Sequence, residues 1–426
     1  MSHLFAAADI LLPNETVDLT KWAALACDQF TSEPAYWQDA EALVQNAPST
    51  LSMVLPELYL DGADTPARIA NIHKAMQDNL QNTLTRTVHG FVYVERKTPC
   101  GVRCGLVGTV DLEAYSYEKG AAPLVRPSEN TVVERIPPRL AVRTGAALET
   151  PHILMLLDDD ACAIIEPLAL QKQTFVPLYD FDLMLDGGHI SGYGITDAKL
   201  IAELEARIDA LADPDYFAQK YPGANRDKPM ALAVGDGNHS LATAKAHWEE
   251  IKQTLSPAQR ENHPARRCLV ELVNIHCPAI VIEPIHRVLL GTDESTLLLA
   301  ACDYLEGVGA TLCPPEQSEQ VFHVLTQHSD SVAGVKNAPA PIAVGTLEGF
   351  LSQYLAQNPC VKVDYIHDEA SVHALVEKGY LGIILPPFAK SDVFRGVVMG
   401  GVLPKKTFSM GAAREKRYYL ECRKIR

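Results

Sequence analysis

The residues with the clearest chemical potential stand together in the run GDGNHS, which occupies positions 235–240. A short apolar run, 230–234, precedes it, and an alanine-rich stretch, 241–254, follows it. This pattern predicts a buried strand, a tight turn and the N-terminal end of a helix. The free backbone N–H groups and the positive dipole end of such a helix bind anions such as phosphate. We therefore expect an anion site at this turn.

The side chains of the turn add groups that could act on a bound phosphate. Asp236 and His239 are residue types that transfer protons in many enzymes, and a carboxylate can also hold magnesium. We expect both to be catalytic residues. The remaining members of the turn are expected to bind the ligand, and they are Gly235, Gly237, Asn238 and Ser240.

Further candidates lie outside the turn, and their convergence on it is an expectation. Arginine matches phosphate geometry with two parallel hydrogen bonds, and a nearby acid can serve as a base. Glu129 is the expected third catalytic residue. The expected ligand-binding residues are Arg126, Arg139, His286 and Arg287. Together these groups supply what phosphoryl transfer requires, which is a phosphate cradle, a charge clamp, a metal and a positioned base.

An ordinary structural role is the competing interpretation of the same residues. Gly-Asp-Gly-Asn is a common turn composition, Asn238 or Asp236 could cap the helix, and His239 could be a surface residue. The Walker phosphate loop, the dinucleotide-binding fingerprint and the HExxH zinc motif are all absent from the sequence. The turn therefore indicates a class of ligand but no specific reaction.

Composition and charge restrict the classes of protein that remain. The 426 residues carry a formal net charge of −16, which disfavours a general nucleic-acid binder. No apolar run of about 18 residues is present, so no transmembrane helix is expected, and the N-terminus lacks the basic region of a signal peptide. The ten cysteines form no CxxC pair, as expected for reduced thiols. We expect a cytoplasmic protein that binds neither nucleic acid nor membrane.

The elements that position these residues alternate between helix and strand, which indicates an α/β (α+β) fold. Strands are predicted at 90–96 and 102–112 with a turn between them, and a long amphipathic helix at 65–84. The expected domains are 1–290, which contains the turn, and 291–426. In the second portion the predicted helices span 294–305, 318–328, 347–357, 368–378 and 392–399, and the predicted strands span 342–346, 361–366 and 382–385.

Six short motifs occur in the same order as in a family of bacterial and archaeal proteins, domain-of-unknown-function family 1015. The segment VGDGNHSLATAKAHW is similar to the family signature ADGHHRYETAL, and RPSENT at 126–131 is similar to RPHERT. PIHRVL at 284–289 is similar to PTHRVL, and LPKKTF at 403–408 is similar to MPPKSTYF. ACDQ at 26–29 stands in the place of PYDV, and PRL at 138–140 in that of DRL. The resemblance covers nearly the whole chain.

The turn departs from the family signature at two positions. Asn238 stands where the family has its first His, and Ser240 stands where it has Arg. The missing arginine removes a charged bidentate contact worth about 1.5–3 kcal/mol. The turn also resembles, more remotely, the phosphate-binding turn of the ParB/sulfiredoxin-like superfamily, which includes free-serine kinases. That resemblance implies a ParB/sulfiredoxin-like core, magnesium and a nucleotide as cofactors, and a small anionic or phosphorylated ligand as partner.

Two classes of function follow from these expectations. The first is a phosphotransferase or phosphohydrolase that uses a nucleotide or phosphorylated metabolite and acts on a small, serine-like hydroxy compound. The second is a non-catalytic regulatory protein that binds a small anion or nucleotide. Ser240 in place of Arg favours the second class, whereas the presence of Arg126, Glu129 and His239 favours the first.

Overall fold

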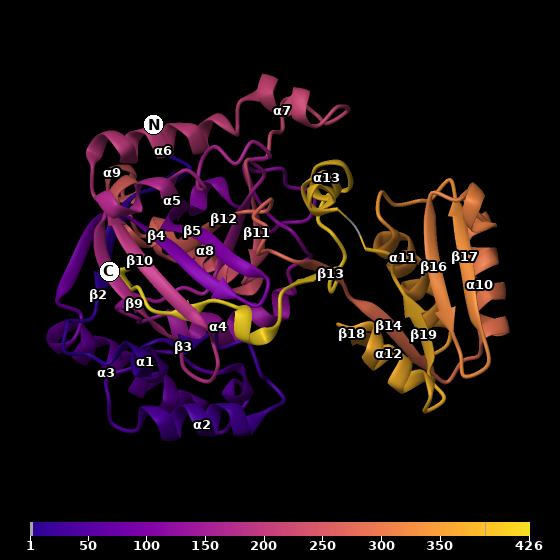
Figure 1. The fold of residues 1–426 in the computed structure, drawn as a ribbon, viewed down its shortest axis with the longest axis horizontal. Coiled ribbons are helices and arrows are strands. Elements are labelled where there is room, and N and C mark those ends of the chain that lie inside the picture. The colour runs from indigo at the N-terminus through magenta and orange to yellow at the C-terminus, as the bar shows by residue number, and fades with distance from the viewer. Residues whose placement is uncertain (1–2, 388) are drawn as a thin grey trace. The chain divides into compact units, whose positions relative to one another are not determined.

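The computed structural model describes residues 3–387 and 389–426. It consists of two compact units, one formed by Met1–Ile280 with Gly411–Arg426 and the other by Val281–Met410. The C-terminal segment thus returns to the first unit, whereas the sequence had led us to expect a single division at residue 290. Both units mix helices and strands, which confirms the predicted α/β class (Figure 1).

The first unit is built on a ten-stranded sheet with the order β6-β11-β8-β12-β5-β4-β10-β9, in which β1 pairs with β5 and β2 with β4. Its central hairpin, β4 and β5, is the one predicted at 90–112, with Thr98 opposite Gly101 at the turn. The strands are β1 (Phe5–Ala6), β2 (Ala8–Leu12), β4 (Arg86–Thr98), β5 (Gly101–Asp111), β6 (Val125–Pro127), β8 (Leu154–Leu157), β9 (Val176–Asp182), β10 (His189–Ile195), β11 (Leu232–Asp236) and β12 (Arg267–Asn274).

Both faces of this sheet are covered, because alternate side chains of a strand point to opposite faces. Val92 and Val94 of β4 belong to one hydrophobic core, and Phe91 and Tyr93 belong to the other. Helices α1, α2 and α3 pack in the first core, and α6 and α8 in the second. The helices are α1 (Leu19–Trp22), α2 (Pro34–Val44), α3 (Thr65–Asn82), α4 (Ile136–Arg143), α5 (Leu168–Gln171), α6 (Ala198–Ala210), α7 (Pro214–Lys220), α8 (Asn238–Lys252) and α9 (Pro257–Asn262).

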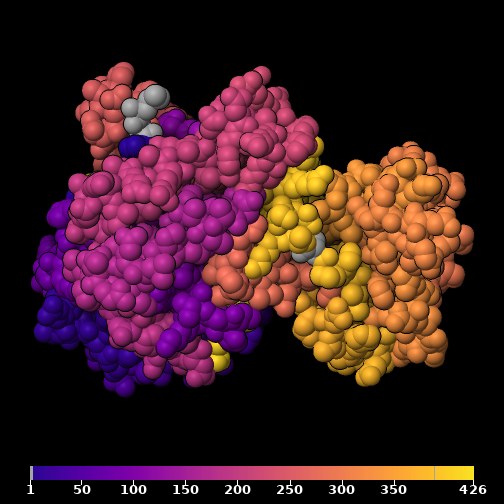
Figure 2. All heavy atoms as spheres, turned by 45° about the horizontal axis from the view of Figure 1, so that its top comes forward, coloured from indigo at the N-terminus to yellow at the C-terminus, as the bar shows by residue number. Residues whose placement is uncertain are grey.

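Residues distant in sequence adjoin on the surface of this unit, where indigo N-terminal residues lie against magenta residues from the middle of the chain (Figure 2).

The C-terminal segment of the chain is part of the first unit. Strand β21 (Tyr418–Tyr419) pairs with β3 (Ala24–Leu25), and β22 (Arg423–Lys424) pairs with β7 (Leu148–Glu149). The indole N–H of Trp22 donates to the carbonyl of Leu420 over 2.9 Å. Residues 418–420 are at most 2% exposed, so this segment is part of the core.

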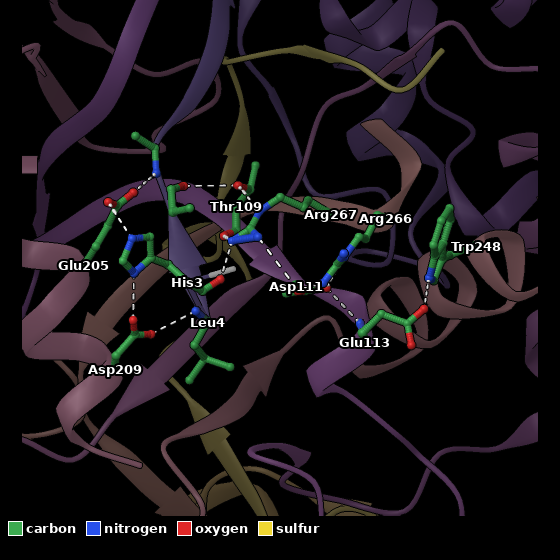
Figure 3. A network of polar contacts seen from close by, with 12 residues as sticks. His3, Leu4, Thr109, Asp111, Glu113, Glu205, Asp209, Trp248, Arg266 and Arg267 are labelled. Carbon is green, nitrogen blue, oxygen red and sulfur yellow. Dashed lines mark hydrogen bonds and ion pairs between the residues drawn. The ribbon is translucent and has the colours of Figure 1, made fainter. Parts of the chain in front are cut away.

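A polar network fixes the helix that follows the turn (Figure 3). At its C-terminal half, the indole N–H of Trp248 donates to Glu113 over 2.5 Å. The backbone N–H of Glu113 donates in turn to Asp111, which forms an ion pair with Arg266 at 2.6 Å. Helix α8 is thereby held against the end of β5, far from its own N-terminus.

The second unit has a six-stranded sheet with the order β15-β17-β16-β19-β14-β18. Strands β13 and β20 form a separate pair. The strands are β13 (Ile282–Pro284), β14 (His286–Leu290), β15 (Thr311–Cys313), β16 (Gln320–Leu325), β17 (Asp330–Lys336), β18 (Lys362–Ile366), β19 (Leu381–Ile384) and β20 (Phe408–Met410). The helices are α10 (Glu294–Gly307), α11 (Ala343–Gln357), α12 (Glu369–Val376) and α13 (Lys390–Gly400).

Two predictions for this unit were wrong. The helix predicted at 318–328 is strand β16, because QVFHVL pairs with β17 on one side and β19 on the other. The strand predicted at 342–346 is the start of α11, where Val344, Leu347 and Leu351 form one buried face at helical spacing. Short apolar runs such as these fit either period until their neighbours decide. No helix in the described ranges is long and apolar enough to cross a membrane.

Candidate functional site

The GDGNHS run joins β11 to α8, as the sequence predicts. Helix α8 begins at Asn238, three positions before the predicted start at 241, and no side chain caps it. The N–H groups of Ser240 and Leu241 donate to the carbonyl of Gly237. The N–H groups of Asn238 and His239 make no hydrogen bond within the described part of the chain. Two backbone donors therefore stand free at the positive end of a 15-residue helix.

Gly237 has a conformation that other residues rarely adopt, with φ +82° and ψ 29°. A Cβ atom at this position would lie 3.1 Å from Cγ1 and 3.2 Å from Cα of Ile153. Any other residue would adopt this φ only with strain, and its Cβ atom would press on Ile153 more closely than Cβ atoms usually approach a neighbour. Glycine at position 237 thus brings the turn directly against the chain that enters β8.

The loop that follows β6 borders the turn. Strand β6 runs parallel to β11 with Pro127 opposite Val234, so Ser128 and Glu129 leave the sheet at the same edge as the turn. The hydroxyl of Ser128 is fully buried and has no hydrogen-bond partner among the described residues. The backbone N–H of Val132 donates to Nε2 of His239 over 3.3 Å. The structure therefore brings the predicted residue Glu129 to the same edge as Asp236.

His239 is held neutral at this position. Burial, together with the positive charges of Arg139 and Arg135, lowers the pKa of His239 to about 4. Because its Nε2 accepts the N–H of Val132, its proton resides on Nδ1. His239 is thus a hydrogen-bond donor at neutral pH, and its basic nitrogen is already engaged. Its role as a proton acceptor stays a prediction.

His247, two turns further along α8, gives a pH-dependent prediction. It is 3% exposed, and burial with the charges of Arg143 and Arg426 lowers its pKa to about 4. Below pH 6.5, His247 takes up a proton in the unfolded chain but stays neutral in the folded chain. The free energy of unfolding therefore falls as pH drops from 6.5 towards 4. We expect His247→Gln to reduce this loss by about 1 kcal/mol between pH 6.5 and 5. Urea unfolding across this range measures it, and an equal loss in variant and wild type would contradict it. His328→Gln, at an exposed position, is the control.

Two side-chain oxygens at the turn accept no hydrogen bond from the described residues. Oδ2 of Asp236 and Oδ1 of Asn238 are buried and accept no hydrogen bond from any described residue. The nearest cation to Asp236 is Lys416, whose Nζ lies 3.6 Å from Oδ2. Buried acceptors are normally satisfied, so this pair of oxygens is available to a ligand.

The sequence did not single out His152, which lies just before β8 and faces the turn. Its Nε2 lies 3.2 Å from the hydroxyl of Ser240 and 3.5 Å from the carboxylate of Asp28. Its Nδ1 lies 2.6 Å from the hydroxyl of Tyr419, which the C-terminal segment contributes. A buried histidine is thus oriented at both nitrogens. Ser240, at the position of the family arginine, helps to hold it.

His152 and Asp28 form a coupled pair. Burial opposes charge on His152, but Asp28, with Asp236 and Glu57, raises the pKa of His152 above its ordinary value. Burial would likewise raise the pKa of Asp28, yet His152, with Gln29 and Lys416, holds that pKa well below its usual range. Each group thus favours the charged form of the other.

Arg139 lies near the turn, and Arg126 is committed elsewhere. Helix α4 packs on α8, and the guanidinium of Arg139 donates to Glu57 and to the carbonyl of Arg135. The guanidinium of Arg126 donates to three backbone carbonyls, those of Pro123, Lys228 and Pro229. Arg126 therefore fastens the linker that enters β11.

His286 and Arg287 belong to the second unit, and both make polar contacts there. The buried guanidinium of Arg287 pairs with Glu348 at 2.7 Å and lies over the ring of Tyr365, 4.4 Å from its centre. Nδ1 of His286 accepts the backbone N–H of Leu385 over 3.2 Å, and burial lowers the pKa of His286. These contacts account for both residues within the fold of that unit.

A cavity of about 150 Å³ opens beside the turn. Its wall includes Ser240 of α8, His152 and Tyr419, so the oriented histidine borders it directly. Arg139 also lines it, whereas most of the remaining wall is apolar. No group of three or more His, Cys, Asp or Glu side chains able to hold a metal ion was found in residues 3–387 and 389–426.

These features define an α/β protein with an open helix N-terminus, a buried histidine paired with a half-buried acid, and a small cavity at one site. The chain belongs to the family described as Protein of unknown function (DUF1015), whose pattern matches residues 8–352. Five of the six sequence motifs lie in this range, and the motif at 403–408 lies beyond it. Among curated proteins, none matches this chain. The more remote ParB/sulfiredoxin-like resemblance stays a prediction.

Several solved structures are weakly similar to this chain. A conserved hypothetical protein from Pyrococcus furiosus has a TM-score of 0.35 and 12% identity over 74% of this chain and 94% of its own. A free serine kinase in complex with AMP has a TM-score of 0.36 and 11% identity over 73% and 90%. SbnI with C-terminal truncation from Staphylococcus aureus has a TM-score of 0.35 and 10% identity over 72% and 82%. At these values the similarity carries no statement about ligand or reaction.

Proposed function

We propose that this protein binds a nucleotide or phosphorylated metabolite at the β11–α8 turn, together with magnesium, and acts as a phosphotransferase or phosphohydrolase on a small hydroxy compound. The observation that carries the proposal is the coincidence of free donors and free acceptors at one turn. The N–H groups of Asn238 and His239 are unbonded among the described residues, and so are Oδ2 of Asp236 and Oδ1 of Asn238.

These residues fit a phosphate and a magnesium ion together better than a phosphate alone. Backbone N–H groups at a helix start bind phosphate oxygens, but the carboxylate of Asp236 would repel them. Magnesium takes oxygen ligands and is commonly held by one or two side chains together with substrate phosphates and water. Asp236 and Asn238 would supply those side-chain oxygens. Lys416, 3.6 Å from Asp236, would add positive charge beside the phosphate.

Asp28 and His152 together would serve in the transfer of the proton from the acceptor hydroxyl group. Phosphoryl transfer to a hydroxyl group needs a carboxylate that orients the hydroxyl and accepts its proton. Asp28 is charged at neutral pH and borders Ser240 through His152. His152, held by Tyr419, would keep that carboxylate in place and balance its charge. Glu129 and His239 remain proposed contributors at the same edge.

The first test compares binding in the wild type and in Asp236→Asn. Titration calorimetry with Mg·ADP should give a dissociation constant that rises at least about tenfold in the variant. Binding of inorganic phosphate without magnesium should be unchanged or tighter, because a repulsive carboxylate has been neutralised. Asp227→Asn, in an exposed loop, is the matched control. Equal Mg·ADP affinity in wild type and Asp236→Asn would remove Asp236 from the site.

Gly237→Ala tests the turn itself. The left-handed conformation should cost about 1–2 kcal/mol in an alanine variant, and the contact with Ile153 should displace the free N–H groups. We expect affinity for both Mg·ADP and inorganic phosphate to fall at least about tenfold. Gly309→Ala, in the second unit, has a similar φ of +79° and no neighbour within 4 Å of the added atom, so it separates strain from displacement. Unchanged phosphate affinity in Gly237→Ala would argue against an anion at this turn.

The competing function is a regulatory protein that binds the same ligand without chemistry. Two observations favour it, since Nε2 of His239 is occupied by Val132 and the guanidinium of Arg126 is occupied by carbonyls. A protein of this class would bind Mg·ATP stoichiometrically and release no phosphate with any hydroxy compound offered. His239→Ala adds a second readout, because loss of turnover with retained binding would assign His239 to the reaction.

A further inference from the structure

We propose that the hydroxy compound is an uncharged, largely apolar molecule of about six heavy atoms, which the cavity beside His152 accommodates. This inference rests on the proposed function, because it names the acceptor for that site. It departs from the serine-like compound expected from sequence. Three properties of the cavity support it: its lining, its paired charges and its volume.

The lining is apolar beyond the edge that His152 and Ser240 form. Met53, Leu55 and Met76 contribute buried side chains, and they belong to segments that pack in the first hydrophobic core. An alkyl group gains about 25 cal/mol for each Å² of its surface that such a wall covers. A hydroxyl attached to that group would stay at the polar edge, where Asp28 and His152 lie.

The charged residues of the wall already have partners. Arg139 pairs with Glu57, and Arg143 pairs with Glu149 at 2.7 Å. His152 is paired with Asp28. A zwitterion such as free serine would lose the hydration of two charges and find no unpaired charge among the described lining residues. An uncharged group loses almost nothing on entering.

The thiols of the wall behave as apolar groups. Burial, followed by the charge of Asp28, raises the pKa of Cys27 to about 12. Burial and Glu149 raise the pKa of Cys268 well above its ordinary value. Both are therefore protonated at neutral pH and act as small hydrophobic surfaces.

The volume sets the size of the group. A cavity of about 150 Å³ with apolar walls holds a molecule the size of benzene, which has six heavy atoms. A branched five-carbon chain with one hydroxyl group has the same number. Serine has seven heavy atoms, so its charges, and not its size, would exclude it.

The experiment uses the full chain and three probes, which are 3-methyl-1-butanol, L-serine and Mg·ADP. Ligand-observed NMR should detect the alcohol and not serine, and calorimetry should detect Mg·ADP. Leu60→Trp, from the partly exposed wall, should weaken the alcohol about tenfold and leave Mg·ADP within about twofold. Leu58→Trp, two positions away and outside the cavity wall, is the control. Ala146→Leu fills the cavity from another segment if Leu60→Trp does not fold.

The outcomes distinguish the inference about the cavity from the proposed function. Alcohol binding that both cavity-filling variants weaken supports the inference. Binding of serine without the alcohol, or alcohol binding that neither variant changes, overturns it. If Mg·ADP fails to bind while the alcohol binds and responds to Leu60→Trp, the proposed function falls and the apolar specificity of the cavity is supported on its own.

Discussion

Replacing Arg417 with methionine is expected to lower the free energy of unfolding by about 3–5 kcal/mol. The guanidinium is 2% exposed and pairs with two buried carboxylates, those of Glu271 and Glu421. Burial would lower the pKa of Arg417, but Glu421 and Glu271 raise it further above its ordinary value. Without the arginine, Glu421 would remain buried with no ion-pair partner among the described residues, and Glu271 would keep only Arg103, at 3.8 Å. Denaturant unfolding followed by circular dichroism measures the loss.

A triple variant that removes the charges of all three residues tests whether charge or packing causes this loss of stability. Arg417→Met combined with Glu271→Gln and Glu421→Gln removes the uncompensated charges, and we expect it to recover most of the lost stability. Arg414→Met is the surface control, because Arg414 is 47% exposed in its pair with Asp186, and it should change stability by less than about 1 kcal/mol. If the single and triple variants were equally unstable, packing rather than charge would explain the effect.

The largest expected effect on activity belongs to Asp28→Asn. The amide cannot take a proton or stabilise a positive charge on His152, so the pKa of His152 should fall. Under the proposed function, phosphoryl transfer should slow about 10²- to 10⁴-fold. Stability should respond in the same sense, since the raised pKa of His152 stabilises the fold at low pH and that contribution is lost as pH rises through it. NMR titration of His152 and turnover with Mg·ATP and a hydroxy compound measure the two effects.

The control for this variant is Asp9→Asn, which removes an exposed carboxylate at 2.6 Å from His89. It should leave turnover unchanged. A normal rate in Asp28→Asn would assign the proton transfer to another group, and Asp236 and Glu129 would be examined next. An unchanged pKa for His152 would show that Asp28 does not govern that histidine.

The local part of the site could be predicted from sequence. The turn, the strand before it and the helix after it depend on neighbouring residues, and glycine at 237 is required by a local conformation. The β4–β5 hairpin is local in the same way. The helix start differed by three residues, because Asn238 begins α8 without a capping side chain, which is the usual signal.

The rest of the site depends on contacts between residues far apart in the chain. His152 is one of 14 histidines and has no distinguishing neighbour in sequence. Tyr419 and Lys416 come from a basic C-terminal stretch that resembles a solvated tail, yet Tyr419 is buried beside His152. Pairing of β21 with β3 joins residues almost 400 positions apart, and no local pattern encodes that pairing.

The return of residues 411–426 to the first unit has a consequence for biosynthesis. The second unit interrupts the first in the order of synthesis, so β3 and β7 emerge from the ribosome long before β21 and β22 exist to pair with them. Tyr419 and Lys416 reach the site only after all of residues 281–410 have been made. A chain cut short by a premature stop codon after residue 410 would therefore lack part of the candidate site. The candidate site is therefore completed last, which couples its formation to completion of translation.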